Sequence, residues 1–186
     1  MKKKHLLLYL LIVLTTISYS QNLDSLLKGK HFEISFGQSL LFISNSNQVS
    51  FRKSTDIVVP TSAILFFAEF RPQKIVRIPV YLNLPTESKQ YIVNGVLTNE
   101  KASPAFGSGV VFKLFQIKID SKSKIEFETG PLVSIIYDTK DNIRFAPIVA
   151  GRLKISRGEN FVMYFGVSYS AGINALGILY GTGTTF

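Results

Sequence analysis

From residue 31 onward, apolar and polar side chains alternate along the chain with a period of two residues, which is the pattern of β-strands. No stretch of helical length carries a 3.6-residue apolar stripe. The alternation predicts eight strands, at 31–43, 57–71, 74–84, 106–120, 123–137, 143–156, 159–170 and 177–186. Many are longer than the roughly 5 to 6 residues usual in soluble sheets, and reach the roughly 9 to 11 that a tilted strand needs to cross a bilayer.

The connections between these strands alternate between tight and longer ones. Three are short, polar and turn-prone, at 71–74, 120–123 and 156–159. The others are 44–56, 85–105, 138–142 and 171–176, and the first two of these are long. Short periplasmic turns opposite longer extracellular loops are typical of an up-and-down barrel in the bacterial outer membrane.

The two faces of the strands differ in the way that such a barrel requires. In the third strand Ile78, Val80 and Leu82 share one face, whereas Arg77 and Tyr81 lie on the other. An apolar outer face suits lipid, and closure removes the unpaired edges that lipid cannot satisfy. Outward aromatic residues also fall near strand ends, as in the aromatic girdles of these barrels: Phe32, Phe70, Phe127, Phe161 and Phe186 at the short-turn rim, and Phe42, Tyr137, Phe145 and Tyr169 nearer the long-loop rim.

The first thirty residues have a different pattern. Residues 1–20 combine three lysines, a nine-residue apolar run and small residues near position 20, which predicts a signal peptide cleaved before Gln21. The run is too short for a helix that crosses a bilayer, which needs about 20 residues. We expect residues 21–30 to form a periplasmic lead-in and residues 31–186 to form the barrel.

Composition then excludes several classes of function. Loss of the three signal lysines lowers the formal charge from +9 to +6, and the remaining positive residues form no concentrated face, so we expect no nucleic-acid partner. The chain has no cysteine, which excludes disulfides, a lipid-attachment cysteine and thiolate chemistry.

Charged residues on the inward phase predict a network in the lumen. Charges in a narrow barrel must be paired, because desolvation otherwise costs several kcal/mol per ion. Glu69 and Arg77 should meet across one tight turn, and Lys118 and Glu126 across another. We therefore expect a salt-bridged, side-chain-filled lumen, with an ion or proton path as the alternative. The predicted network is Glu33, Glu69, Arg77, Lys118, Glu126, Glu128, Arg152 and Lys154.

Candidate catalytic and cofactor chemistry is sparse. His31 is the only histidine after cleavage, and it falls at the periplasmic start of the first strand. We therefore predict no catalytic residue, no metal site and no cofactor. Gly107 and Gly109 do not belong to a dinucleotide fingerprint. Gly181 and Gly183 alternate inward, where we expect them to relieve crowding.

Two features conflict with regular strands. Pro79, Pro131 and Pro147 fall inside predicted strands, where their missing N–H interrupts a ladder. Lys113 falls on the lipid-facing phase, where a lysine costs about 2 to 4 kcal/mol. A β-bulge at Leu114 or Phe115 would turn Lys113 inward, so we predict one there.

The last strand resembles the C-terminal β-signal of outer-membrane proteins, with Ile178, Tyr180, Thr182, Thr184 and Phe186 in its outward phase. The whole mature chain resembles the small outer-membrane β-barrel proteins common in Bacteroidota. The resemblance implies an all-β, eight-stranded antiparallel transmembrane barrel, located in the outer membrane and inserted by the barrel-insertion machinery. It adds little about activity.

Three functions stay open at this stage. We favour a structural or interaction barrel whose loops meet a protein partner or lipopolysaccharide, with Arg52, Lys53, Lys89 and Lys101 placed to pair with lipid A phosphates. The second is a soluble periplasmic lipocalin-like carrier of an apolar ligand, which needs the opposite face polarity. The third is a lipid A modifying enzyme, whose activity would be lost on replacing His31.

Overall fold

A computed structural model describes residues 31–43, 57–137, 143–158 and 160–186 of the chain. The predicted signal peptide, the lead-in and the loops 44–56 and 138–142, with Arg52 and Lys53, lie outside the described residues. No helix in the described part of the chain is long and apolar enough to cross a bilayer.

The described residues form twelve β-strands. Their bounds are β1 Phe32–Ile43, β2 Ile57–Val59, β3 Thr61–Phe70, β4 Val76–Pro85, β5 Lys89–Val93, β6 Val96–Glu100, β7 Ala105–Gly109, β8 Val111–Lys118, β9 Ser123–Tyr137, β10 Ile143–Arg157, β11 Phe161–Ser170 and β12 Ala175–Thr185.

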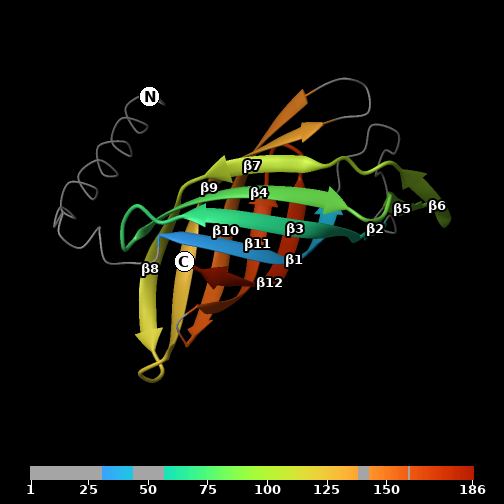
Figure 1. Cartoon of the computed structure of the whole chain (residues 1–186). Coiled ribbons are helices and arrows are strands. Elements are labelled where there is room, and N and C mark those ends of the chain that lie inside the picture. The colour runs from blue at the N-terminus through green and yellow to red at the C-terminus, as the bar shows by residue number, and fades with distance from the viewer. Residues whose placement is uncertain (1–30, 44–56, 138–142, 159) are drawn as a thin grey trace, which may run out of the picture.

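Nine of these strands form one closed antiparallel sheet (Figure 1). The order is β10-β11-β12-β1-β3-β4-β7-β9, and β9 pairs with β10 to close the ring. β7 and β8 follow one another between β4 and β9, separated only at Val110, so they fill one position of the barrel. The barrel therefore has eight positions, which confirms the predicted fold.

The predicted second strand is interrupted at Pro60. β3 stays in the barrel, whereas β2 pairs with β5, and β5 pairs with β6, in a separate three-stranded sheet. Figure 1 shows this small sheet beyond one end of the barrel. Proline supplies no backbone N–H and fixes φ, which suits a point where the chain leaves one ladder for another.

The hairpin β5–β6 lies within the long connection 85–105, where the sequence analysis predicted no strand. Its turn is Asn94-Gly95, with φ of 52° and 78°. Both values are positive, as a type I′ turn requires, and Asn-Gly is the sequence that this turn favours. The sequence signal for a β-hairpin was therefore present, as an Asn-Gly pair between two short apolar segments.

The in-strand prolines lie inside β4, β9 and β10. The ladder of β4 passes from β7 to β8 around the buried Pro79, where Ser108 Oγ donates a hydrogen bond to the Pro79 carbonyl oxygen at 2.9 Å. Val110, in the gap between β7 and β8, donates its N–H to the Pro131 carbonyl oxygen at 3.0 Å. Backbone groups at these interruptions thus find partners without a regular ladder.

The predicted β-bulge is present. The β8–β9 register passes from Lys113 opposite Glu128 to Phe115 opposite Phe127, so Leu114 is the extra residue. Lys113 Nζ lies 3.2 Å from Glu126 Oε1. The bulge turns the lysine toward a carboxylate and leaves Leu114 exposed.

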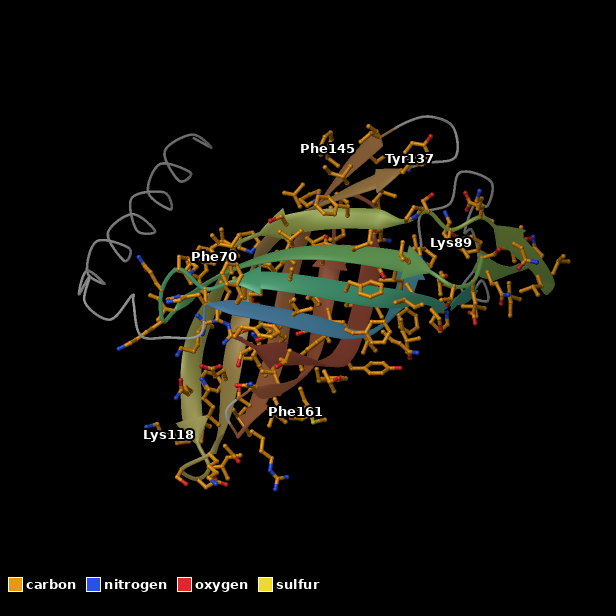
Figure 2. The ribbon with its side chains drawn as sticks, viewed as in Figure 1. Phe70, Lys89, Lys118, Tyr137, Phe145 and Phe161 are labelled. Carbon is orange, nitrogen blue, oxygen red and sulfur yellow. The ribbon has the colours of Figure 1, made fainter. Side chains whose placement is uncertain are left out.

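The outer face of the barrel wall is apolar, and the inner face of its short-turn half carries buried charges. On β10 Val149 is 63% exposed and Leu153 is 43% exposed, whereas Arg152 and Lys154 between and beside them are 7% and 0% exposed. Figure 2 places Phe70 and Phe161 at one end of the barrel, and Tyr137 and Phe145 at the other. The apolar outer face opposes a soluble lipocalin-like carrier, whose outer face would be polar.

Single-residue deletions test whether Leu114 is the bulged residue of β8. Because Leu114 has no opposite partner, its deletion should leave the phase on both sides unchanged and lower the free energy of unfolding by at most about 1 kcal/mol. Deletion of Leu153 in the regular β10 ladder should move Arg152 or Lys154 toward lipid and cost about 2 to 4 kcal/mol or more. Urea unfolding in micelles measures both. Equal losses would contradict the assigned bulge.

Candidate functional site: the barrel lumen

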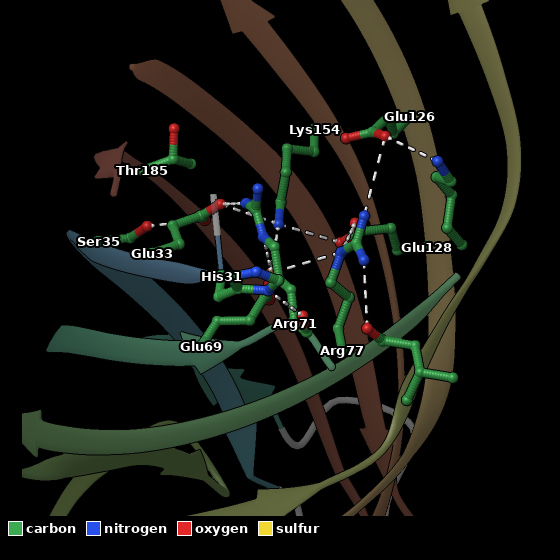
Figure 3. A network of polar contacts seen from close by, with 12 residues as sticks. His31, Glu33, Ser35, Glu69, Arg71, Arg77, Glu126, Glu128, Lys154 and Thr185 are labelled. Carbon is green, nitrogen blue, oxygen red and sulfur yellow. Dashed lines mark hydrogen bonds and ion pairs between the residues drawn. The ribbon is translucent and has the colours of Figure 1, made fainter. Parts of the chain in front are cut away.

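Seven of the eight predicted network residues are buried together in the part of the lumen near the short turns (Figure 3). They come from β1, β3, β4, β9 and β10, so strands far apart in the sequence meet in one cluster. These residues are Glu33, Glu69, Arg77, Glu126, Glu128, Arg152 and Lys154.

Lys154 is the centre of the cluster and is fully buried. Its Nζ lies 2.8 Å from Glu69 Oε1, 3.2 Å from Glu33 Oε2 and 3.3 Å from Glu128 Oε2. A lysine ammonium has three donors, and three carboxylates surround this one. The desolvation that burial imposes is thus offset by several charge partners.

Two arginines connect the same carboxylates. Arg152 contacts Glu69 and also donates from Nε to Glu128 Oε2 at 2.7 Å. Arg77 Nε lies 3.3 Å from Glu128 Oε1 and 3.7 Å from Glu69 Oε1, and its Nη1 donates to the Gln73 carbonyl oxygen at 2.9 Å. The predicted meeting of Glu69 and Arg77 across the tight turn is present in the structure.

Three further cations belong to the cluster in addition to the predicted network, and of these only Lys113 was expected to turn inward. Arg71 contacts Glu33 and Glu69, and Lys113 and Lys124 each lie 3.2 Å from Glu126 Oε1. Arg71 follows Glu69 by two residues and Lys124 precedes Glu126 by two. The period-two phase therefore carried the signal for both.

Arg71 lies just beyond the end of β3. Burial, followed by repulsion from Arg77, lowers the pKa of Arg71 to about 10. A guanidinium with that pKa stays charged at neutral pH, so its contacts with carboxylates persist.

Lys118 does not join the cluster, which corrects the prediction. Its Cα partner is Lys124, its side chain is exposed beside the turn at 119–122, and the described ion pairs do not include it. Figure 2 shows Lys118 near this tip. The residue opposite Glu126 is Gln116, and Lys113 and Lys124 reach the Glu126 carboxylate instead.

An aromatic layer covers the charge cluster on the side away from the short turns. The Phe67 ring centroid lies 5.6 Å from that of Tyr164, edge to face, and 5.9 Å from that of Tyr81. Arg152 lies 5.7 Å from the Phe67 centroid, a cation–π distance. A Cβ at Gly181 would overlap the Tyr164 hydroxyl, so this inward glycine makes room for the layer, as expected.

Beyond the aromatic layer, the half of the lumen nearer the long loops contains a cavity of about 170 Å³. The expectation of a fully filled lumen is therefore wrong for this half. The inward residues here are small or aliphatic, such as Ser39, Ser134, Ala150 and Leu132, and they do not reach across the barrel. The charge cluster and the aromatic layer fill only the half near the short turns.

His31 lies at the short-turn end. Its Nδ1 is 3.2 Å from the Arg71 carbonyl oxygen, which accepts a hydrogen bond from the ring. Among the described residues, no three His, Asp or Glu side chains gather as metal ligands would.

The residues of the predicted β-signal lie on β12 and just after it, between β11 and β1. Tyr180, Thr182 and Phe186 are exposed, whereas the inward Leu179 is buried. Tyr180 donates its hydroxyl to Gln38 Oε1 at 2.5 Å. The outward phase matches the resemblance, and recognition by an insertion machinery stays a prediction.

The charge cluster predicts unequal effects of two substitutions. Glu128→Ala removes a carboxylate that contacts Arg77, Arg152 and Lys154, so it should lower the free energy of unfolding by about 3 to 5 kcal/mol. Lys118→Ala removes an exposed charge and should change it by about 0.5 kcal/mol or less. Unfolding in detergent micelles tests both, and similar values for the two variants would show that the cluster is not dry.

No protein-family model matches the chain, and no curated protein is similar to it in sequence. Among solved structures, the outer membrane protein OprG from Pseudomonas aeruginosa matches with a TM-score of 0.51 and 12% identity, covering 86% of this chain and 97% of that chain. The N-terminal β-barrel domain of P. aeruginosa OprF matches with a TM-score of 0.48 and 12% identity, covering 84% and 98%. Neisserial surface protein A matches with a TM-score of 0.46 and 13% identity, covering 83% and 97%. The likeness to OprG shows that the chain has the fold of a small outer-membrane β-barrel.

Proposed function

We propose that this chain resides in the outer membrane as a non-enzymatic structural or interaction barrel, acting through its rims and loops. One observation carries the proposal: the buried ion cluster around Lys154, covered by Phe67, occupies the lumen near the short turns. A lumen closed in this way favours neither transport nor an ion path, and it leaves the long-loop end for contact with other molecules.

Location in the outer membrane is supported by the polarity of the wall. The exposed apolar side chains of β10 and β11 would be costly in water and suit lipid, and the closed ring leaves the barrel without an unpaired edge. The predicted signal peptide and the outward phase of β12 support export and recognition by the insertion machinery. Membership of the Bacteroidota-type group rests on these two sequence features and is part of the proposal.

The long-loop end offers two kinds of contact. The hairpin β5–β6 exposes Val96 and Leu97, at 64% and 54%, which favours an apolar protein contact. Lys89 and Lys101 lie at or beside this hairpin, where lysines attract phosphates such as those of lipopolysaccharide. We place the interaction surface here.

A lipid A modifying enzyme is the second candidate, and the position of His31 opposes it. Such chemistry belongs near the outer leaflet, whereas His31 lies beside Arg71 at the short-turn end. If purified protein modified lipid A and His31→Ala abolished that activity, the non-enzymatic proposal would be wrong.

Because the lumen is closed, we expect the protein to have no channel conductance. Purified protein in planar bilayers should give no discrete openings above leak, because Arg77, Arg152 and Lys154 with their carboxylate partners occupy the lumen. A porin reconstituted in the same bilayers is the positive control. Reproducible unitary openings from the pure chain would overturn this part of the proposal.

The hairpin gives a test of location and of interaction together. The full chain should fractionate with the outer membrane and shift in gel mobility on heating. A variant with residues 88–101 replaced by a Gly-Ser linker should do the same, because among the described strands β5 and β6 pair with β2 and with one another, outside the barrel sheet.

The same variant should lose binding to lipopolysaccharide micelles. Double substitution Lys89→Gln and Lys101→Gln should weaken that binding about tenfold or less, as expected for two exposed cations. Lys118→Gln, at the opposite end, is the matched control. Unchanged binding after hairpin replacement would move the interaction surface elsewhere, and recovery of soluble protein from periplasm would contradict the location.

A further inference from the structure

The outer face of β8, β9, β10 and β11 changes from apolar to polar near the short turns. Residues opposite one another in antiparallel strands share a face, so the register defines rows across the wall. Two successive rows are wholly apolar: Phe115, Phe127, Leu153 and Phe165 form one, and Ile117, Ile125, Ile155 and Met163 form the next. The row nearest the turns instead places Arg157 between Ser123 and Phe161. The lipid-facing band of this wall therefore ends at Arg157.

Arg157 is the last residue of β10 and lies on its outward phase. It follows Leu153 and Ile155 on the same face and, like them, is exposed. The inward cations of the same strand, Arg152 and Lys154, are held by glutamates in the lumen. The ion pairs in the described part of the chain do not include Arg157. Its guanidinium thus stands at the edge of the apolar band without a carboxylate partner there.

The turn between β8 and β9 places a second cation beside this one. The Gly158 N–H donates a hydrogen bond to the Lys122 carbonyl oxygen at 2.8 Å, which joins the turn after Arg157 to the β8–β9 turn. Lys122 is exposed and is likewise not part of a described ion pair. The nearby Asp120 accepts the backbone N–H of Lys122 at Oδ1, at 2.7 Å, so its carboxylate already has a partner. The two joined turns therefore present two cations on one side of the barrel end.

The position of these cations indicates what they bind. Ile119 and Phe161, at the two ends of the Arg157 row, are 60% and 47% exposed, so lipid reaches both sides of the arginine. Phospholipid phosphates lie just beyond the hydrocarbon core, where long basic side chains reach them from an apolar surface. A guanidinium can bind a phosphate with two parallel hydrogen bonds, and a lysine adds a point charge. A soluble anion would need no apolar residues beside it.

We propose that Arg157, together with Lys122, binds the phosphate of an anionic phospholipid in the leaflet at the short-turn end. The site lies at the opposite end of the barrel from the β5–β6 hairpin, so it goes beyond the interaction role of the loops. It rests on the proposed location in the membrane. Lys118, which Figure 2 shows at the same end, lies on the inward phase of β8 and takes no part.

The chain has no tryptophan, so a single introduced one reports on the lipid beside it. Phe161→Trp places an indole opposite Arg157 on the outer face. The full mature chain with this change is reconstituted in phosphatidylcholine vesicles that contain a small fraction of brominated lipid, which quenches the indole fluorescence on contact. Brominated phosphatidylglycerol should quench about fivefold more effectively than brominated phosphatidylcholine, which is the factor that one basic side chain at an anionic surface implies.

Two glutamine variants of the Phe161→Trp protein separate the outer face from a general effect of charge. Arg157→Gln should lower the preference for phosphatidylglycerol to about twofold or less, because only Lys122 remains at the site. Lys118→Gln removes the same charge at the same end but on the inner face, and should leave the preference unchanged. Arg157→Lys keeps the charge and should retain most of the preference.

A second tryptophan distinguishes failure of this site from failure of the proposed location. Phe106→Trp lies on the outer face of β7, away from both turns, and should be quenched equally by the two lipids. If neither lipid quenched either tryptophan, location in the membrane would be contradicted. Equal quenching by both lipids at Phe161→Trp in an inserted chain would overturn the phospholipid site alone. A preference that Arg157→Gln leaves unchanged, or that Lys118→Gln lowers to the same extent, would overturn it too.

Discussion

The pairing of charges inside the lumen is the constraint on which the rest of this structure depends. Lys154 on β10 contacts carboxylates from β1, β3 and β9, so one side chain joins four strands of the ring. A slip of one residue in any of these strands would exchange its inner and outer faces. It would bring a charge to lipid, at about 2 to 4 kcal/mol, and leave a buried partner unpaired. The cluster thus fixes strand register and closure at once.

Most of the fold could be predicted because few local rules generate it. Period-two alternation located the strands, and polar turns located the connections. The misfit of Lys113 located the bulge, because a lysine on the lipid phase is too costly to accept. The hairpin β5–β6 was not predicted, although Asn94-Gly95 is a strong turn signal. Its strands are five residues each, too short to cross a membrane, so they lack the long alternation that marks the barrel strands.

The candidate site could be predicted only in part, because its details depend on geometry across strands. The period-two alternation along the strands correctly placed the buried glutamates on the inner face. The same alternation also places Arg71 there. The alternation alone does not show which lysine contacts Glu126, because that contact depends on the bulge at Leu114 and on the end of the strand at Lys118. The cavity is harder still. Whether inward side chains such as Ala150 and Leu132 meet across a barrel depends on the strands opposite, which no single segment encodes.

The division of the lumen into a charged half and an apolar half follows from the same energetics. An apolar cavity beside the cluster lowers the local dielectric, which strengthens the ion pairs and raises the cost of any unpaired ion. Phe67 separates the two halves, with Arg152 near its ring and the aliphatic wall above. The lumen is therefore closed by ion pairs near the short turns and hollow toward the long loops.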